Sequence, residues 1–492
     1  MRERIKTELS DNFSSTVILP SILNDYKNSF KEMILLNKAY AIMLGKTDII
    51  EKEAVGEILE GLDYVEKTLK PEDLSAKYED FYFNVENAMM KKTGKTGGKL
   101  HAGRSRNDIH SAVTRMEIRK TVWTVLDDLV ALQKLLLEKA ETNKDAVMTG
   151  YTHFQPGQPI TLAYYYLAIY SALARDYARI KSAYENLNVS PYGAAAFAGS
   201  SFPVDRGLLC ELLGFDKVME NSLDCIASRD YILELLSAYS IMAVNLSRMA
   251  EDMYFWATYE NGILDVPGEI AICSSIMPQK KNPVSLEYAK SKAAHEIACA
   301  SSAMITLKGT PYSNTMDIFE TPGMYWEGVR QIRQILCCIS ETVTYAKLRR
   351  EAAAKKAAEN LCTVTSLADY MVKYFKIAFV EAHHIVGSMI AVITENGAGI
   401  RGITPELIRK ESKAVLGYEL EISEAQIDSV LDPYNNVQTK QGIGGPSAES
   451  VTRMIENAGT TLKEETDWLE GAKEHVRRAY EKLGREQAEF CK

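Results

Sequence analysis

Three polar segments combine the residue types that proton chemistry on a small anion requires. The first is LHAGRSRNDIH, residues 100–110, in which Ser105 and Arg106 stand next to Asn107 at the predicted start of a helix. A guanidinium, an amide and the free N–H groups of a helix N-terminus together favour a bound carboxylate. The alternative is a basic turn with a polar helix cap, and this segment alone does not decide between the two.

The second segment is GYTHFQPGQPI, residues 150–160. The backbone around Thr152 and His153 is restricted by two glycines and two prolines, at positions 150, 156, 157 and 159. Such a sequence favours a rigidly placed imidazole over one on a solvated face. A structural role for a single histidine is the alternative.

The third segment is CSSIMPQKKNPVSLE, residues 273–287. It contains two serines, two adjacent lysines and an Asn282–Pro283 pair that starts a helix carrying Glu287. This composition is typical of a loop that closes over an anion. As a purely structural solvent loop it would be unusual.

Long helices are predicted between these segments. From Ile232 onward apolar residues recur at a spacing of three and four, at positions 235, 239, 242, 246, 249 and 253. A second helix is predicted around residues 122–136 and a third from Pro283 to about Leu307. Long amphipathic helices pack as bundles, and an apolar stripe that exceeds one core is covered by another subunit. We therefore expect an oligomer, with a monomeric bundle as the alternative.

Shorter helices are predicted near the C-terminus. Thr404 followed by Pro405 is a helix start, and Ser423 with Gln426 forms a capping box. Strand signals are sparse, although residues 147–152 favour a short extended piece, and no alternation of strands and helices occurs. The predicted fold class is all-α.

Composition excludes several classes of protein. The 492 residues are 46% hydrophobic and 25% charged, as in a folded globular chain, and the net charge of −9 disfavours nucleic acid as a partner. No stretch approaches the roughly 18 consecutive apolar residues of a membrane span. Eight cysteines without C-x-x-C spacing indicate reduced thiols rather than disulfides or a metal site. A cytoplasmic location follows as an expectation.

The third segment resembles the signature G-S-S-x-M-P-x-K-x-N of the aspartase/fumarase superfamily, and its K-K-N-P and S-L-E forms are similar to the argininosuccinate lyase branch. Further motifs of that branch follow in the same order, over roughly residues 38 to 455. They are GKLHAGRSRND at 98–108, GYTHFQ at 150–155, FAGSSFPVDR at 197–206, NSLD at 221–224, SRD at 228–230, LSRMAED at 246–252, TLKG at 306–309, EAH at 381–383 and a Gly444–Gly445 turn.

The resemblance implies a three-domain helical fold, with domains at about 1–108, 109–360 and 361–492. The central domain of such proteins joins a twenty-helix core in a homotetramer, and each active site is assembled from three subunits. This arrangement would explain why the polar segments lie far apart in the sequence.

The resemblance also implies roles for individual residues in a reaction that removes a Cβ proton from a succinyl group bound through nitrogen. Ser274 is the implied base, and Lys280 and Asn282 stabilise the resulting dianion. His153 binds or protonates the departing side, with Glu287 orienting its ring. The succinyl carboxylates are held by the remaining polar residues, Ser105, Arg106, Asn107 and Thr152. The scheme requires no cofactor and no metal.

The chain departs from the branch where the rest of the substrate would bind. A Tyr, Gln and Lys set that reaches the arginine moiety is replaced by Asn314, Phe319 and Pro322, with Tyr312 close to the vacant Tyr position. Met33 stands where an acidic residue is usual, and Cys273 replaces a Gly. We therefore predict β-elimination of an N-substituted L-aspartate to fumarate and an amine. The alternatives are argininosuccinate lyase itself, giving arginine and fumarate, and a catalytically silent, crystallin-like relative.

Overall fold

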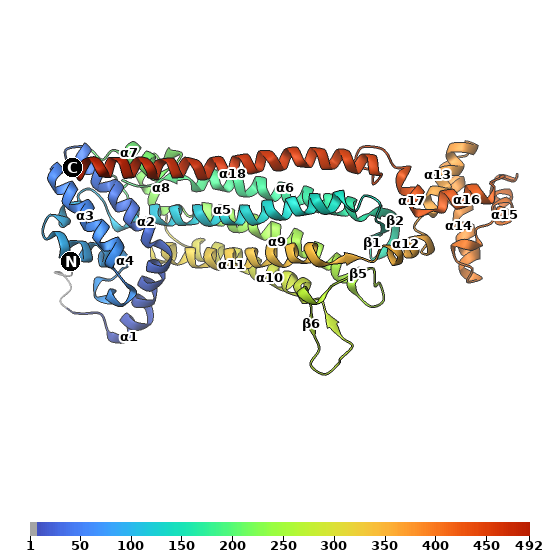
Figure 1. Cartoon of the computed structure of the whole chain (residues 1–492), viewed down its shortest axis with the longest axis horizontal. Coiled ribbons are helices and arrows are strands. Elements are labelled where there is room, and N and C mark those ends of the chain that lie inside the picture. Colours follow the sequence, from blue (N-terminus) through green and yellow to red (C-terminus); the bar gives the residue numbers. More distant parts are fainter. Residues whose placement is uncertain (1–6) are drawn as a thin grey trace.

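The computed structural model of the chain describes residues 7–492 and is almost entirely helical. Figure 1 shows an elongated molecule, with a compact helical unit at the N-terminal end, a bundle of long helices in the middle and a small helical unit at the far end. The predicted all-α class is confirmed. Among the described residues no helix combines the length and the apolar character needed to cross a membrane.

The central bundle contains the three predicted long helices. Its members are α5 (Arg106–Glu141), α6 (Leu162–Leu187), α9 (Asp230–Ala257), α10 (Val284–Leu307) and α11 (Met316–Tyr345). The apolar positions predicted for α9, from Leu235 to Met253, are fully buried, so this stripe faces the core as its spacing requires. The third helix begins directly after Pro283 and ends at Leu307, as predicted.

The N-terminal unit packs against the start of α5. It contains α1 (Asp11–Phe13), α2 (Leu19–Lys46), α3 (Lys52–Thr68) and α4 (Phe81–Thr93), with the short helices α7 (Arg206–Leu213) and α8 (Ser222–Ala227) beside it. A second apolar core joins α2, α3, α4 and α7 to the first turns of α5. This core fixes the beginning of α5, where the first polar segment lies.

The C-terminal part has two components. The first is a set of short helices, α12 (Arg350–Glu359), α13 (Val364–Phe375), α14 (Phe379–Glu395), α15 (Pro405–Leu416), α16 (Glu424–Leu431) and α17 (Pro433–Gln438). The predicted caps are confirmed, because Thr404 Oγ1 accepts from the N–H of Leu407 and Ser423 forms a capping box with Gln426. The second component is α18 (Ala448–Phe490), which runs back along the bundle (Figure 1).

The end of α18 is fastened to the N-terminal unit. The Gln487 amide donates to Asp63 at 2.8 Å, and the hydroxyl of Tyr480 accepts from Arg119 of α5 at 3.0 Å. The carbonyl oxygen of Phe490 lies 2.9 Å from where a Cβ on Gly56 would stand, so this contact requires glycine. Residues predicted to belong to the third domain therefore pack against the first, and the boundaries at 108 and 360 stay a prediction.

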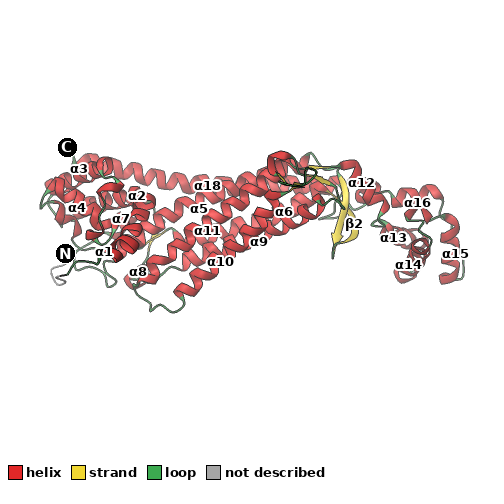
Figure 2. Ribbon diagram, turned by 90° about the horizontal axis from the view of Figure 1, so that it is seen from below, coloured by secondary structure: helices red, strands yellow, loops and turns green. Residues whose placement is uncertain are grey.

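Within residues 7–492 the strands form four two-stranded pieces. The longest pairs β1 (Val147–Thr152) with β2 (Gln155–Thr161) in antiparallel register at the far end of the bundle (Figure 2), which confirms the predicted extended piece. The others are β3 (Val189–Ser190) with β4 (Lys217–Val218), β5 (Leu264–Asp265) with β8 (Lys347–Leu348), and β6 (Ile272–Cys273) with β7 (Lys281–Asn282). Two of these pieces, β1–β2 and β6–β7, are hairpins that carry predicted site residues.

Candidate active site

The start of α5 is a capped helix end with the features that a bound anion would require. Ser105 is the N-cap, and its Oγ accepts a hydrogen bond from the backbone N–H of Asn107 at 3.3 Å. The Asp108 carboxylate accepts one from the N–H of Ser105 at 3.0 Å, which completes a capping box. The dipole of this 36-residue helix is positive here. The Ser105 hydroxyl keeps its own proton to donate to a ligand.

The two arginines of this segment have different surroundings. Arg106 is half-exposed, with Nη1 3.0 Å from an Asp80 oxygen and its guanidinium 4.7 Å from the ring centre of Phe83. Arg104 is buried, and its guanidinium donates to three side chains, those of Asn37, Tyr82 and Tyr192. Arg106 can therefore meet a substrate carboxylate, whereas Arg104 holds the N-terminal unit together.

Asp108 is a functional candidate that the sequence interpretation left out. Besides capping α5, its carboxylate accepts from the N–H groups of Gly193 and Ala195, each at 3.1 Å. Burial raises the pKa of Asp108 to about 7, although these N–H groups and the nearby Arg104 oppose the shift. Asp108 therefore ties the first polar segment to the loop at 193–196. The Ser-x-x-Asp spacing of a capping box is the sequence signal from which Asp108 could have been identified.

Asn107 is held from two sides. Its Nδ2 donates to the carbonyl of Ala196 at 3.0 Å, and its Oδ1 accepts from the Nδ2 of Asn314 at 2.9 Å. Tyr312 is anchored close by, because its hydroxyl donates to the carboxylate of Asp224 in α8. Two of the three candidates for the distal pocket are thus engaged within the chain, and one of them is the partner of a predicted succinyl ligand.

Phe319, the third distal candidate, lies in the first turn of α11. Its ring meets His110 edge to face, with the ring centres 5.0 Å apart and the planes at 83°. Burial lowers the pKa of His110, so its imidazole is neutral at neutral pH. This part of the site offers an aromatic ring and a neutral imidazole in place of a cationic side chain.

The second polar segment forms the β1–β2 hairpin. Thr152 pairs with Gln155, which leaves a two-residue turn made by His153 and Phe154. Both turn residues have positive φ, 52° and 57°, a conformation that costs a residue with a Cβ roughly 1 kcal/mol. Thr152 and His153 are exposed. The backbone around His153 is therefore a tight turn, as predicted, but in the single chain its side chain lies on an exposed face.

The third segment is a hairpin loop between β6 and β7 that projects from the bundle (Figure 1). Ser274 Oγ accepts from the N–H groups of Ile276 at 3.4 Å and Met277 at 3.1 Å. Hydrogen bonds donated to this oxygen favour the alkoxide over the neutral hydroxyl. Lys280 is exposed, and within residues 7–492 no hydrogen bond or ion pair involves its ammonium group. Asn282 ends β7 directly before α10.

Glu287 lies in the first turn of α10 and is exposed. Its Oε1 accepts a hydrogen bond from the hydroxyl of Tyr254 in α9 at 3.2 Å. Within the described chain no hydrogen bond or ion pair joins Glu287 to His153. The implied carboxylate–imidazole pair is therefore not formed inside one subunit.

The first segment lies too far from the other two to form one site with them in a single chain. Helix α5 separates Ser105 from the β1–β2 hairpin, and its 36 residues span about 54 Å at about 1.5 Å per residue. Helix α10 separates Asn282 from the segment of Tyr312 and Asn314, and its 24 residues span about 36 Å. Each chain therefore carries its candidate site residues at two separated ends of the bundle.

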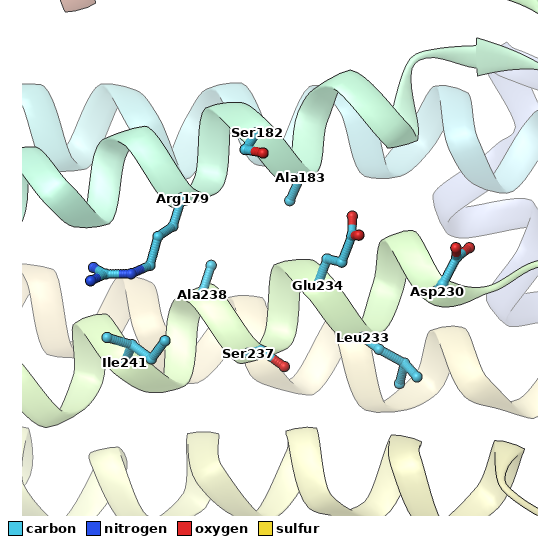
Figure 3. Close-up of a pocket in the computed structure, with 9 residues that line it drawn as sticks. All are labelled: Arg179, Ser182, Ala183, Asp230, Leu233, Glu234, Ser237, Ala238 and Ile241. Carbon is cyan, nitrogen blue, oxygen red and sulfur yellow. The ribbon is translucent and has the colours of Figure 1, made fainter.

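A hollow on the bundle surface between α6 and α9 contains none of the predicted site residues (Figure 3). Its polar lining is engaged in structural contacts, since Arg179 pairs with Asp176 and Glu234 accepts from Asn186. The hollow is therefore no candidate for the reaction.

The chain resembles known proteins over almost its whole length. It matches the family model described as Lyase over residues 4–297 and the model described as argininosuccinate lyase C-terminal over residues 361–438. It is 35% identical to argininosuccinate lyase 1 of Shouchella clausii, over 97% of this chain and 96% of that protein. It is also 35% identical to the argininosuccinate lyase of Methanococcoides burtonii, over 92% of this chain and 91% of that protein.

Among solved structures, EDDS lyase in complex with formate matches with a TM-score of 0.88 and 28% identity. The match covers 99% of this chain and 97% of that one. A variant of EDDS lyase with bound fumarate matches equally well.

Proposed function

Because the chain belongs to the lyase family, in its argininosuccinate lyase branch and with the aspartase/fumarase fold, we propose that its substrate is an N-substituted L-aspartate. The protein is a carbon–nitrogen lyase that produces fumarate, as the sequence predicted. In this elimination a Cβ proton passes to a base and the C=C bond of fumarate forms. The nitrogen leaves with the electron pair of the broken C–N bond and takes up a proton.

The assignment of Ser274 as the base rests on the hydrogen bonds that its oxygen accepts and on the residues of its loop. Two backbone N–H groups point at its oxygen, in a loop that also carries Lys280 and ends at Asn282. Removal of the Cβ proton leaves an aci-carboxylate dianion, which an ammonium group and an amide stabilise. Closure of the loop over the substrate would bring these groups together and exclude water.

We propose that His153 binds or protonates the departing nitrogen. Glu287 would orient the ring through a hydrogen bond to one imidazole nitrogen, which leaves the other to bind or protonate the amine. The succinyl carboxylates would meet Arg106, the Ser105 hydroxyl and the free amide proton of Asn107, with Thr152 brought in on the hairpin. These steps use acid–base and electrostatic chemistry, so the scheme calls for no metal or cofactor.

We further propose a cytoplasmic homotetramer whose active sites are shared between subunits. The separations of about 54 Å along α5 and about 36 Å along α10 support this proposal, because residues so placed in one chain meet only across subunits. The test mixes the inactive variants His153→Asn and Ser274→Ala. Hybrid tetramers should regain part of the wild-type activity. If subunit exchange is demonstrated and every hybrid stays inactive, either the shared-site proposal or the assignment of His153 and Ser274 of one site to different chains is wrong.

The departing amine is proposed to differ from arginine. Asn314 is bonded to Asn107, Tyr312 to Asp224, and Phe319 lies against His110, so these residues present few free polar groups to a zwitterionic tail. Missing hydrogen bonds at such a contact reduce transition-state binding by a few kcal/mol.

A panel of N-succinyl compounds, including argininosuccinate and EDDS, tests both parts of this proposal. Fumarate formation is followed by its ultraviolet absorbance for each compound. We expect kcat/KM for argininosuccinate to be at least about 10²-fold below that of the preferred substrate, equivalent to roughly 3 kcal/mol. Efficient cleavage of argininosuccinate alone would restore arginine as the departing amine. Absence of fumarate from every compound would contradict the proposed substrate class.

A further inference from the structure

The last turn of α9 contacts two of the elements that carry proposed catalytic residues. The hydroxyl of Tyr254 donates to Glu287 Oε1 at 3.2 Å, which links α9 to the first turn of α10. The neighbouring residue, Phe255, packs edge to face against Tyr151 and Phe154, with ring centres 5.2 and 5.5 Å away. Tyr151 and Phe154 flank Thr152 and His153 in the hairpin. Two adjacent residues of one helix thus hold Glu287 on one side and the His153 turn on the other.

Tyr254 holds one oxygen of Glu287 and leaves the other available. Within residues 7–492 no hydrogen bond or ion pair involves Glu287 Oε2. The Tyr254 ring is itself held, because the Lys290 ammonium lies 4.8 Å from its centre and pairs with Glu251 of α9. Burial and the adjacent Glu287 raise the pKa of Tyr254, so its hydroxyl stays a donor throughout the neutral range. Only one oxygen of the carboxylate then remains to accept from an imidazole.

The His153 turn needs support from its surroundings. Both turn residues hold positive φ without being glycine, and such a conformation persists where neighbouring contacts determine it. Phe154 is 60% exposed, and its ring packs against that of Phe255. Removal of the Phe255 ring would leave the turn free to relax and His153 free to change direction.

From this geometry we propose that Tyr254 and Phe255 are positioning residues of the elimination reaction. Tyr254 sets the direction of the Glu287 carboxylate, and Phe255 holds the turn that aims His153. This inference rests on the proposed roles of Glu287 and His153. It adds two residues that act through Glu287 and His153 and not on the substrate directly.

The decisive variant is Tyr254→Phe, which removes a single oxygen atom. We expect kcat to fall about tenfold with KM changed less than twofold, because orientation of the imidazole matters in the transition state more than in binding. Loss of the Tyr254 hydrogen bond leaves more negative charge on the Glu287 carboxylate, so the pH midpoint of kcat should rise by about 0.5. Tyr64→Phe, at a half-exposed tyrosine of α3, is the matched control and should behave as wild type.

A double-variant comparison separates positioning from a general structural role. In a Glu287→Gln background, Tyr254→Phe should have almost no further effect on kcat, because the group it orients is already altered. Phe255→Leu should lower kcat about fivefold in either background, since it acts through His153 instead. If Tyr254→Phe leaves kcat and the pH midpoint unchanged, or if its effect simply adds to that of Glu287→Gln, the role of Tyr254 is overturned.

The same set of variants distinguishes failure of this inference from failure of the proposed function. If His153→Asn and Glu287→Gln leave fumarate formation intact, the proposed catalytic roles are wrong and the inference falls with them. If those two variants are impaired while Tyr254→Phe and Phe255→Leu match wild type, only the inference falls. Gel filtration and thermal melting of each variant confirm that the fold is intact before kinetics are compared.

Discussion

The two ends of α10 present their site residues in opposite states. Beyond the C-terminal end, Asn314 is bonded to Asn107 and Tyr312 to Asp224, all within one chain. Ahead of the N-terminal end, the Ser274 loop projects from the bundle (Figure 1). The region proposed to hold the succinyl carboxylates is therefore organised before the substrate binds. Under the shared-site proposal, the region that carries out proton transfer would be completed by the substrate and by neighbouring subunits.

The largest effect is expected at the open end, in the Ser274 loop ahead of α10. Ser274→Ala should lower kcat for fumarate formation by at least about 10³-fold, because it removes the proposed base. The melting temperature should hardly change, since the side chain lies in a projecting loop and not in the core. Fumarate absorbance and thermal melting measure the two quantities on the same sample.

The neighbouring serine gives the matched control for that experiment. Ser275 is exposed in the same loop, so Ser275→Ala makes the same chemical change one residue away. It should retain most of the activity. An active Ser274→Ala enzyme would remove Ser274 from the mechanism and leave the open loop without a proposed base.

A smaller effect is expected at the organised end. Asp108→Asn replaces one acceptor oxygen by an N–H₂ group that must face a backbone donor, at a buried site that accepts three N–H groups. We expect KM to rise about tenfold with a smaller change in kcat, and the free energy of unfolding to fall by about 2 kcal/mol. Steady-state kinetics and chemical denaturation measure these effects.

The control for Asp108 is the N-cap residue of another helix, α7. Asp205 caps α7, and asparagine caps a helix as well as aspartate does, so Asp205→Asn should leave KM and stability near wild type. If Asp108→Asn lowers stability without raising KM, the organised end depends on Asp108 for folding alone. The contrast between the two ends of α10 would then lose its functional meaning.

Much of the fold could be predicted from the sequence, because its signals are local. The spacing of apolar residues along α9 and the proline before α10 set elements that the structure confirms nearly to the residue. The caps at Thr404 and Ser423 are also local, since each depends on a side chain three residues from its partner.

The path of α18 could not be predicted in this way. Its contacts join Gln487 to Asp63 and Tyr480 to Arg119, over more than three hundred residues. Amphipathic spacing predicts that such a helix buries one face, but it does not say which distant surface receives that face.

The candidate site could likewise be predicted only in its local features. The residue types in the polar segments could be identified from motifs, and their environments could not. Arg104 and Arg106 look equivalent in the sequence, yet one is buried among tyrosines and the other is half-exposed. Asn314 was predicted as part of a distal pocket, and its contact with Asn107 depends on how α10 and α11 pack against α5.

The smallest expected effect concerns α10 itself, the helix between the organised end and the open end. Glu296 lies in the middle of α10, is fully buried, and within residues 7–492 neither of its carboxylate oxygens has a hydrogen-bond partner. Burial, together with repulsion from Glu327, raises the pKa of Glu296 to about 8. The pKa is higher in the folded chain than in the unfolded one. The folded state therefore binds the proton more tightly, and stability is lost as pH rises toward 8.

Glu296→Gln removes this titration while keeping the size of the side chain. The melting temperature of the wild type should fall between pH 5 and pH 8 by more than that of the variant, and at pH 8 the variant should be more stable by about 2 kcal/mol. Glu341→Gln, on the exposed face of α11, should show no such difference. Activity should stay within about twofold of wild type, because Glu296 lies more than two turns from both ends of α10. A loss of activity without a change in the pH dependence of melting would mean that α10 transmits changes between its ends, and the organised and open halves would then be coupled.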